Sequence, residues 1–460
     1  MQQLFPPGFC LHVYERIGQL LPDAASGSFC IALSGGRDST ALLHAMALIA
    51  AASPRFSVRA VHVDHQLQAA SSSWSAHCEQ VCSILHIPFS TERVVPDPQF
   101  PEGVEAAARL ARYDALRRQL LPGETLLTAH HADDQLETVL LALVRGAGVG
   151  GLSAMPEIKR FGSGWHMRPL LGCTRAEVQG WAEENQLTWI DDPSNDLPRF
   201  DRNYLRHEVL PALQRRWPAI ARNVTRSASH VGEARDLLVE LAEADLLRAA
   251  VGRCLDMRVV DTLAPARRGN LLRHWLARNG ARMPSTRKLA ALEHDIGIAA
   301  VDRVPRAAWD DVEVRRYGEL LYCERAQPLL DPSLQLPWSW SASLSLPAGL
   351  GRLRTLPARG IGLAPQRLPP ELQVRFRQGG ERLRLPGRTH RSYLKNLLQE
   401  AQLLPWWRER LPLLYAGKQL VAIADLWIAA DFSTDESDAI RIAWDERPDV
   451  FVQANESSPR

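Results

Sequence analysis

One short string of residues constrains this chain more than any other feature of its sequence. An apolar run at residues 29–33 leads directly into Ser34-Gly35-Gly36-Arg37-Asp38-Ser39, and a helical pattern begins at Thr40. Two glycines let the backbone turn tightly, the two serine hydroxyls can bond phosphate oxygens, and the following helix presents unpaired N–H groups. The string therefore predicts a phosphate-binding loop. The alternative is an ordinary glycine turn in which Asp38 or Ser39 caps the helix.

Apolar runs and helical periods alternate through the first part of the chain. They occur at residues 29–33, 40–52, 58–63, 74–85, 103–120 and 125–129. Strand and helix repeated in this way predict an α/β fold with a doubly wound parallel sheet. Ligands bind such sheets outside the carboxyl ends of the strands, where the loop at residues 34–39 would lie.

The rest of the chain changes character twice. The pattern is helical from residue 227 to about 295, rich in Pro, Gly and Ser from 326 to 370, and mixed after 371, where LQVRF, LPLLYAG and LVAIADLWI read as strands and SYLKNLLQEAQ as a helix. We therefore predict a nucleotide-binding catalytic domain at 1–222 and a mainly helical substrate-binding domain at 223–345. A linker or edge strands at 346–370, an α+β C-terminal domain at 371–453 and a disordered tail at 454–460 would follow.

The loop differs from the Walker type, because no GKS or GKT is present and no lysine can reach the β- and γ-phosphates. The next predicted strand ends in Ala60-Val61-His62-Val63-Asp64-His65. If the strand order is ordinary, these residues lie beside the loop, and the backbone at His62 could read adenine. The alternative for His62 is a solvent-facing residue at a strand end.

A second wall of the site is predicted after the strand at residues 125–129. If one helix includes His130, Asp134, Glu137 and Thr138, these residues share its polar face at i, i+4, i+7 and i+8. That face could look into the cleft. Alternatively, it could be the solvent face of an amphipathic helix with acidic residues near its N-terminus. On another helix Glu105, Arg109 and Arg112 share a face, and an intrahelical ion pair is the simpler interpretation there.

Charge is concentrated in two segments although the net charge is only +2. Residues 199–226 contain seven Arg against Asp201 and Glu208, a local +5; residues 374–410 contain nine Lys or Arg against three Glu, a local +6. Two basic surfaces suggest a partner longer than a nucleotide, such as a nucleic acid. Each segment alone could be an ordinary solvated face.

Cysteines and hydropathy exclude other classes of protein. The seven cysteines include no CxxC pair, so neither a disulfide framework nor a zinc or iron–sulfur site is indicated. No apolar run approaches the about 18 residues of a membrane helix, and the N-terminus is unlike a signal peptide. We expect a soluble cytoplasmic protein that does not bind membranes; whether it is a monomer or a homodimer is open.

Motifs along most of the chain resemble one family. SGGRDS, HVDH, EAAARLARYDAL, TAHHADDQLETVLLALVRGAGVGGLSAM, RPLLGCTRAEV, DDPSNDLPRFDRNYLR and GGERLRLPGRTHRSYLKNLLQEAQLLPWWRERLPLLYAG occur in this order. Together they resemble the tRNA(Ile)-lysidine synthetase family, in its three-domain form, within the PP-loop ATP pyrophosphatase superfamily. One departure follows HVDH, where the family usually continues Gly-Leu-Arg and this chain has Gln66-Leu67-Gln68. The cationic contact at position 68 is therefore missing or supplied elsewhere.

The resemblance implies an AMP-forming carbon–nitrogen ligase. Its substrates would be ATP, L-lysine and the wobble cytidine of isoleucine tRNA with anticodon CAU. An adenylated cytidine would be the intermediate, and lysidine, AMP and pyrophosphate the products. ATP would be held by Ser34, Gly35, Gly36, Arg37, Asp38, Ser39 and His62. Asp38 would bind Mg²⁺, and Arg112 and Arg202 would neutralise phosphate charge or position the adenylate. His130 with Asp134 would help to orient the nucleotide and the nucleophile.

Three other functions would share some of these features. A tRNA thiolase with the same loop would need reactive cysteines or a cluster, and the sequence has no CxxC. A small-molecule amidating ligase would not need two basic surfaces. A non-catalytic RNA-binding protein with a relic nucleotide fold would release no pyrophosphate.

Overall fold

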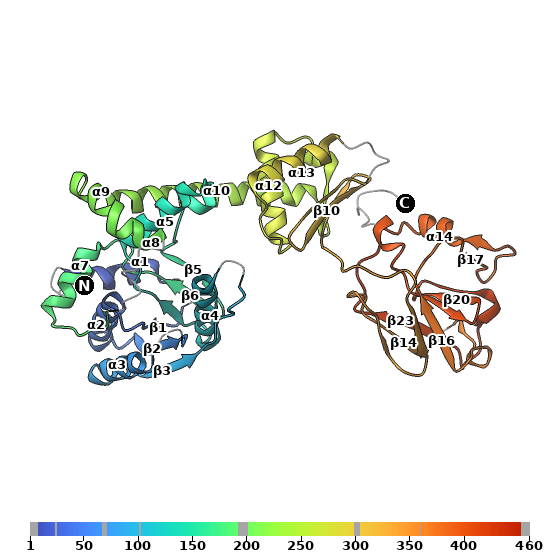
Figure 1. Ribbon diagram of the computed structural model, residues 1–460, viewed down its shortest axis with the longest axis horizontal. Helices are drawn as coiled ribbons and strands as arrows, with labels where there is room; N and C mark the ends of the chain where they lie inside the picture. Colours follow the sequence, from blue (N-terminus) through green and yellow to red (C-terminus); the bar gives the residue numbers. More distant parts are fainter. Residues whose placement is uncertain are drawn as a thin grey trace. The chain divides into compact units, whose positions relative to one another are not determined.

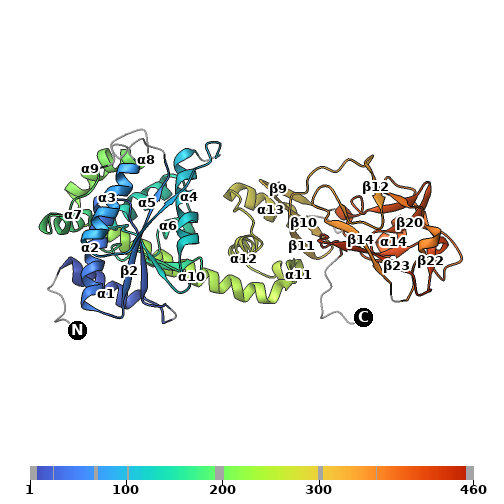
Figure 2. The same ribbon diagram turned by 90° about the horizontal axis from the view of Figure 1, so that it is seen from below.

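The computed structural model describes residues 8–23, 25–66, 71–100, 103–191, 201–298, 304–358 and 360–451. The chain divides into two compact units, Met1–Leu238 and Val239–Arg460. Figures 1 and 2 show the elements of each unit from two sides. In the described ranges, no helix is both long enough and apolar enough to cross a membrane.

The first unit contains the predicted α/β fold, which is confirmed. Its sheet has the order β3-β2-β1-β4-β6-β5, and every neighbouring pair is parallel except β5 with β6. The strands are β1 (Ser28–Ala32), β2 (Ser57–Asp64), β3 (Phe89–Arg93), β4 (Thr125–Leu127), β5 (Ile158–Phe161) and β6 (Gly164–Met167). The order reverses direction at β1, so the carboxyl end of β1 borders the crevice in which ligands of such sheets bind.

Helices cover both faces of this sheet (Figure 2). They are α1 (Phe9–Leu20), α2 (Arg37–Ala52), α3 (Ser71–Ile84), α4 (Val104–Gln119), α5 (Ala132–Val144), α6 (Val149–Leu152) and α7 (Arg175–Glu184). Alternate residues of β1 point to opposite faces: Phe29 and Ile31 pack in a core with residues of α1 and α2, and Cys30 packs in another with Leu116 of α4. Burial on both faces explains why this strand reads as a continuous apolar run.

Four helical segments follow: α8 (Asp201–Tyr204), a π-helix (Leu205–Val209), α9 (Leu210–Arg216) and α10 (Ile220–Ala249). The boundary between the two units falls within α10. The predicted segment DDPSNDLPRF, apart from Asp191, lies outside the described residues.

The second unit begins with helices and a small sheet. The helices are α11 (Met257–Val260), α12 (Pro265–Arg278) and α13 (Thr286–Ile298). The strands β7 (Ala250–Val251), β8 (Cys254–Asp256), β9 (Arg306–Trp309), β10 (Val312–Tyr317) and β11 (Leu320–Arg325) form a sheet of order β7-β8-β11-β10-β9. The prediction of a mainly helical region at 223–345 missed this sheet. Its strands are short, and charged residues, among them Glu313 and Arg315, lie beside the buried Val312 and Val314, which belong to the same core cluster as residues of α12.

The remaining strands form two five-stranded sheets. One has the order β12-β16-β19-β20-β21, from β12 (Gln335–Ser339), β16 (Glu371–Arg375), β19 (Leu413–Ala416), β20 (Gln419–Ile423) and β21 (Trp427–Ile428). The other has the order β13-β14-β23-β15-β22, from β13 (Leu344–Ser345), β14 (Arg352–Pro357), β15 (Gly362–Leu363), β22 (Ser433–Thr434) and β23 (Ile440–Asp445). A short hairpin of β17 (Arg382–Leu383) and β18 (Ser392–Tyr393) precedes α14 (Leu394–Glu400).

These sheets change the predicted boundaries. The helix expected after residue 371 is present as α14, and the strands LQVRF and LPLLYAG are present as β16 and β19. LVAIADLWI, expected as one strand, forms two, β20 and β21, which pair with each other antiparallel. However, β14 lies between β13 and β23, so residues 346–370 contain an interior strand and are neither a linker nor only edge strands. The predicted boundary at residue 345 also separates β12 from β16, with which it pairs. Pairing between distant strands leaves no local signal in the sequence, which is why the boundary was misplaced. The predicted tail at 454–460 lies outside the described residues.

Candidate active site

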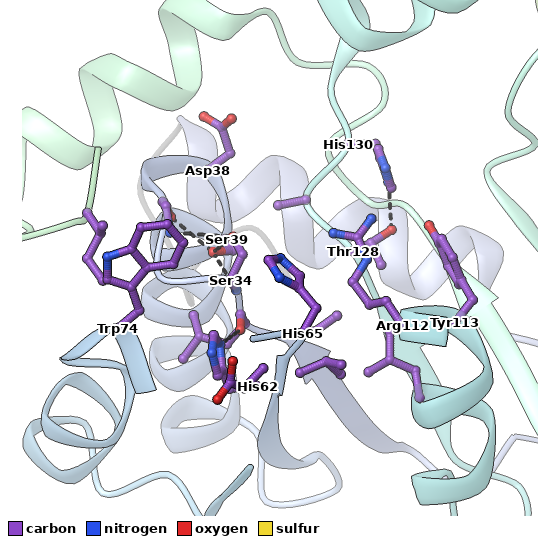
Figure 3. Close-up of a pocket in the computed structure, with 18 residues that line it drawn as sticks. Ser34, Asp38, Ser39, His62, His65, Trp74, Arg112, Tyr113, Thr128 and His130 are labelled. Carbon is purple, nitrogen blue, oxygen red and sulfur yellow. Dashed lines mark hydrogen bonds between the residues drawn. The ribbon is translucent and has the colours of Figure 1, made fainter. Parts of the chain in front are cut away.

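A pocket of about 350 Å³ lies at the carboxyl ends of β1, β2 and β4 (Figure 3). In that view Trp74 and the β1–α2 loop lie on one side, and Arg112, Tyr113 and His130 on the other. The polar and aromatic side chains that line it are Ser34, Asp38, Ser39, His62, Asp64, His65, Trp74, Arg112, Tyr113, Thr128 and His130. Phosphate-loop, β2-end and β4-end residues thus meet at one edge of the sheet, as the sequence predicted.

The β1–α2 loop is held open by its own hydrogen bonds. The backbone N–H of Ser34 donates to Oγ of Ser39 over 3.2 Å, and the Ser39 hydroxyl donates to the carbonyl of Gly36 over 3.0 Å. Gly35 has φ +82°, a region that favours glycine, and its carbonyl accepts from the N–H of Ile190 over 2.9 Å. These bonds fix the loop ahead of the first turn of α2, whose N–H groups and dipole suit an anion.

Asp38 stands in the first turn of α2 as an ionised carboxylate. Burial acts to raise its pKa, but the hydrogen bond and charge of His131 and the charge of Arg37 lower that pKa to about 2. Oδ2 lies 3.6 Å from Nε2 of His131, and Oδ1 accepts from Nε of Arg37 over 3.3 Å. A fixed negative charge therefore borders the loop at neutral pH.

His131 was not among the predicted site residues, yet its ring contacts carboxylates of both α2 and α5. It precedes α5, and its backbone N–H donates to Oδ2 of Asp134 over 3.1 Å. Its ring is buried, with Nε2 3.6 Å from Oδ2 of both Asp38 and Asp134 and Nδ1 3.7 Å from Oδ2 of Asp133. Burial opposes its charged form, but the carboxylates of Asp134 and Asp38 outweigh burial and raise its pKa. The HHADD string contained this signal, because a residue before a helix with an acidic residue three positions later is typical of a capped N-terminus.

His130 lies in the loop before α5, because the helix begins at Ala132. The predicted helical face that His130 would share with Asp134 is therefore wrong. His130 lines the pocket, whereas Asp134 does not and instead contacts His131 and Arg206. A helix start two residues later than the pattern suggested separates the two side chains.

The buried carboxylate of Glu137 on α5 forms ion pairs with three arginines. Glu137 is fully buried, and its oxygens lie 3.2 Å from Arg175, 2.8 Å from Arg202 and 2.9 Å from Arg206. Several cations around one buried carboxylate offset the cost of removing its charge from water. Arg202, predicted at the chemistry, belongs to this cluster and reaches Oδ1 of Asp134 at 4.0 Å.

The wall opposite the loop is cationic. Arg112 lines the pocket, with its guanidinium 5.6 Å from the centre of the Tyr113 ring. Burial lowers the pKa of Arg112, with Arg109 and Arg202 adding to this effect against the opposing contribution of Tyr113; an arginine nevertheless keeps its charge. The Glu105 side chain that could pair with this helix lies outside the described residues.

The remaining predicted residues have local contacts. Nδ1 of His62 lies 2.9 Å from the carbonyl oxygen of Leu33, so its buried ring ties β2 to β1. Arg37 donates to Gln179 over 3.1 Å as well as to Asp38, and it is not among the residues that line the pocket. The N–H of Gln66 donates to Asp64 over 2.9 Å, whereas Gln68 lies outside the described residues.

Comparisons with known proteins agree with the site. A family model described as the PP-loop domain matches residues 10–213, one described as the TilS substrate binding domain matches 255–322, and one described as the TilS substrate C-terminal domain matches 372–444. The tRNA(Ile)-lysidine synthase of Coxiella burnetii is 41% identical over 92% of this chain and 94% of its own. Those of Xanthomonas campestris and Pectobacterium atrosepticum are 42% and 40% identical over 92% of this chain and 97% and 96% of their own. The chain therefore belongs to the tRNA(Ile)-lysidine synthase family, whose nucleotide-binding part is a PP-loop domain.

Proposed function

We propose that this protein joins lysine to C2 of the wobble cytidine of isoleucine tRNA, using ATP and releasing AMP and pyrophosphate. The observation that carries the proposal is the pocket in which the SGGRDS loop faces Arg112 and His130 across the carboxyl ends of the strands. A nucleotide held there has a phosphate loop on one side and cations on the other. Relatives named tRNA(Ile)-lysidine synthase, similar over nine-tenths of the chain, support the choice of substrate.

The reaction needs two steps because the 2-oxo group of cytosine is a poor leaving group. In the first, that oxygen attacks the α-phosphorus of ATP and pyrophosphate leaves. In the second, the lysine ε-amine attacks C2, the C–O bond breaks and AMP leaves with the oxygen. The wobble base lies in a single-stranded loop, so it can be turned into the pocket at modest cost in stacking.

The residues fit divalent-metal chemistry at Asp38. Magnesium is usually held by one or two carboxylates together with substrate phosphates, so it needs no dedicated protein cage. Within the described ranges, no cluster of three or more His, Cys, Asp or Glu side chains is arranged to hold a metal ion, and Asp38 offers the ionised carboxylate beside the loop. We assign Mg²⁺ to this position; when bound, the ion would neutralise phosphate charge.

Lysine enters as an ammonium ion with a free pKa near 10.4, so it must lose a proton before it attacks. The ionised carboxylate of Asp38, which lines the pocket, would favour binding of this cation. Arg112 would contact the nucleotide phosphates. Arg202, anchored on Glu137, would provide the second cation at the reacting group. We place the reaction in the cytoplasm, where its tRNA and ATP are found.

A tRNA thiolase is not favoured. Sulfur transfer would need reactive cysteines or a cluster, and all seven cysteines are free thiols of which six are buried. Burial raises the pKa of Cys78, Cys82 and Cys173 to about 12 in each case. Thiols in this state are poor nucleophiles at neutral pH.

The proposal is tested by incubating the full chain with isoleucine tRNA, ATP and lysine and analysing the tRNA nucleosides by mass spectrometry. We expect a new nucleoside with the mass of cytidine plus lysine less water, together with equal amounts of AMP and pyrophosphate. Omission of lysine should abolish the product, and a tRNA whose anticodon lacks the wobble cytidine is the matched control. Incorporation of sulfur, or no mass change with an active ATP site, would overturn the assignment.

A further inference from the structure

Four side chains form a continuous line of hydrogen bonds that ends at the pocket. Nη2 of Arg168 lies 3.3 Å from Nδ1 of His166, Nε2 of His166 lies 2.8 Å from Oγ1 of Thr128, and Oγ1 of Thr128 lies 2.8 Å from Nδ1 of His130. Figure 3 shows the last of these contacts. Because β6 runs parallel to β4, with His166 opposite Leu126, the strand register brings these residues together.

The contacts among the described residues give the line one direction. A guanidinium can only donate, so Nδ1 of His166 accepts and the ring of His166 carries its proton on Nε2. That N–H donates to Oγ1 of Thr128. If Nδ1 of His130 also donated to this oxygen, the buried threonine hydroxyl would have no acceptor among the described residues. The hydroxyl therefore donates to Nδ1 of His130, and the remaining proton of the neutral His130 ring lies on Nε2.

The inner members of the line are held rigidly. His166 is fully buried, and its ring centre lies 5.7 Å from that of Tyr113 and 5.6 Å from that of Phe161. Nη1 of Arg168 donates to the carbonyl of Pro156 over 2.6 Å, which fixes the guanidinium. Burial, with the charge of Arg168 adding to it, lowers the pKa of His166 to about 2, so this ring stays neutral.

The surroundings of His130 also favour its neutral form. Burial has the largest effect, and the guanidiniums of Arg168, Arg112, Arg109 and Arg202 follow, so the pKa of His130 lies well below its ordinary value. No described residue forms a hydrogen bond with Nε2 of His130, and the residue lines the pocket. Its one free polar atom is therefore available to a ligand.

We propose that Arg168, His166 and Thr128 are positioning residues that lock His130 as a neutral imidazole whose Nε2–H donates to an acceptor atom of the bound nucleotide or cytosine. The inference rests on the proposed function for the identity of the ligand. The same tautomer excludes His130 as the general base. A ring whose Nδ1 already accepts a hydrogen bond and whose Nε2 is protonated cannot take the proton of the lysine amine, so His130 is a hydrogen-bond donor and not the general base.

The tautomer can be read without any assay of activity. Long-range ¹⁵N–¹H spectra of the full chain distinguish protonated from unprotonated ring nitrogens, and the His130 signals are assigned by their loss in His130→Gln. We expect Nε2 protonated and Nδ1 unprotonated from pH 6 to 8. Thr128→Val should disturb this pattern and Thr128→Ser should keep it. A proton on Nδ1, or an imidazolium at pH 7, would overturn the proposal.

Kinetics separate a donor from a base. Glutamine keeps an N–H donor but cannot accept a proton near neutral pH, so His130→Gln should keep kcat/KM within about fivefold, whereas His130→Ala should lose about 10- to 100-fold, the range for one hydrogen bond. The pH profile of His130→Gln should have the shape of the wild-type profile. If glutamine were as damaging as alanine, or removed a limb of the profile, His130 would be a base. Wild-type protein that made no lysidine would defeat the proposed function alone, because the spectra would still decide the tautomer.

Discussion

Nε2 of His131 lies 3.6 Å from Oδ2 of Asp38, so the residue that precedes α5 contacts the carboxylate in the first turn of α2. The same nitrogen is 3.6 Å from Oδ2 of Asp134. One buried imidazole thus lies between carboxylates from the two walls of the candidate active site. The attraction between the imidazolium of His131 and the carboxylate of Asp38 acts on both groups: it raises the pKa of His131 and helps to lower the pKa of Asp38 to about 2.

The first prediction concerns the charge of Asp38. Asp38→Asn keeps the size of the side chain and removes the charge beside the loop, so lysine-dependent pyrophosphate release should fall by about 100-fold or more. The fold should persist, because Asp38 makes polar contacts at the pocket and is not packed in the apolar core. Circular dichroism checks the fold and pyrophosphate release checks the chemistry. Turnover close to that of the wild type would remove Asp38 from the site.

The second prediction concerns Arg202. In Arg202→Ala, Glu137 keeps Arg175 and Arg206, so no buried charge is left unpaired and the fold should survive. Product formation should fall at least tenfold if a charge-assisted contact to the reacting group is lost, whereas tRNA affinity should change less than about twofold. Asp134→Ala should act in the same direction with an added loss of stability, because Asp134 accepts the N–H of His131.

Arg145→Ala is the matched control for Arg202→Ala. Arg145 lies just after α5 and makes a 3.7 Å ion pair with Asp201, but both side chains are mostly exposed. Its loss should leave both turnover and tRNA affinity unchanged. A filter-binding assay in which Arg202→Ala reduced affinity as much as turnover would make Arg202 an RNA contact.

The third prediction separates the two loop glycines. A Cβ at Gly35 would lie 3.1 Å from Sγ of Cys78 and from Cδ1 of Ile190, at φ +82°, so Gly35→Ala should destabilise the domain by about 1 kcal/mol or more. At Gly36, φ is −73° and the nearest atom to a Cβ is Oγ of Ser34 at 3.5 Å. Gly36→Ala should therefore fold normally and lower ATP affinity only if phosphate approaches this backbone. Urea denaturation and ATP titration of both variants make the comparison, and equal stability losses would contradict it.

The sequence could predict the loop because all its signals are local. A strand, two glycines, two serines and a helical pattern follow one another within 29–40. The helix itself begins at Arg37 and not at the predicted Thr40, so Asp38 and Ser39 lie in its first turn.

Helix α5 begins at Ala132, so His130, which lines the pocket as predicted, lies before it and does not share a helical face with Asp134, and the contact of His131 with Asp134 was missed. The spacing of polar and apolar residues along the sequence could not show at which residue this helix begins.

Other parts of the site depend on contacts between distant segments. Glu137 meets Arg175, Arg202 and Arg206, which lie 38 to 69 positions further along the chain. The line from Arg168 to His130 depends on the register of β4 against β6. The family motifs placed Arg112 and Arg202 near the chemistry, but only the fold shows that Arg202 is held by a buried carboxylate.

The fourth prediction concerns pH and Glu324 in the second unit. Nε1–H of Trp406 donates to Oε2 of Glu324 over 2.8 Å, and Nε1–H of Trp407 donates to Oε1 over 3.4 Å. Burial raises the pKa of Glu324 above its ordinary 4.5, against the smaller opposing effect of the two indoles. Folding then favours the protonated carboxyl. The protonated Glu324 side chain therefore adds to the free energy of unfolding. This contribution is fully present below the pKa of Glu324 in the unfolded chain and is lost as the pH rises through its pKa in the folded protein.

Glu324→Gln removes this dependence and keeps an acceptor for the indoles. The difference in unfolding free energy, wild type minus Glu324→Gln, should therefore be more favourable at pH 5 than at pH 7.5. Urea denaturation at the two pH values measures it, and other titrating groups cancel in the difference. An identical difference at both pH values would mean that the Glu324 pKa is not raised.

The last prediction concerns tRNA binding by the C-terminal basic cluster, which comprises Arg375, Arg377, Arg382, Arg384, Arg388, Arg391 and Lys395. Arg384 and Arg391 pair with Asp431, and Arg375 donates to the carbonyl of Gly417, so these side chains are partly engaged within the protein. Arg388 lies 3.6 Å from Glu400 with both side chains half exposed, and the Arg382 guanidinium lies 4.1 Å from the centre of the exposed Tyr393 ring. These two, with Lys395, are the cations best placed to exchange their present contacts for phosphate.

Replacement of Arg382, Arg388 and Lys395 by Ala should flatten the dependence of tRNA affinity on salt. Each phosphate contact that is lost lowers the slope of log K against log salt by about 0.7 to 0.9, so the triple variant should lose about 2 to 3 units of slope. The tRNA KM should rise, whereas the constants for ATP and lysine should not change.

The control variant replaces three other arginines, which pair with Glu446, Asp445 and Asp425, by Ala: Arg352, Arg354 and Arg447. Its slope should match that of the wild type. Point substitutions are preferable to truncation near residue 345, because truncation would leave β12 without β16 and Glu324 without Trp406 and Trp407. If the variant of Arg382, Arg388 and Lys395 had the same slope as the control variant, the C-terminal basic cluster would not contact the tRNA backbone. We would then assign tRNA binding to the other basic segment, residues 199–226.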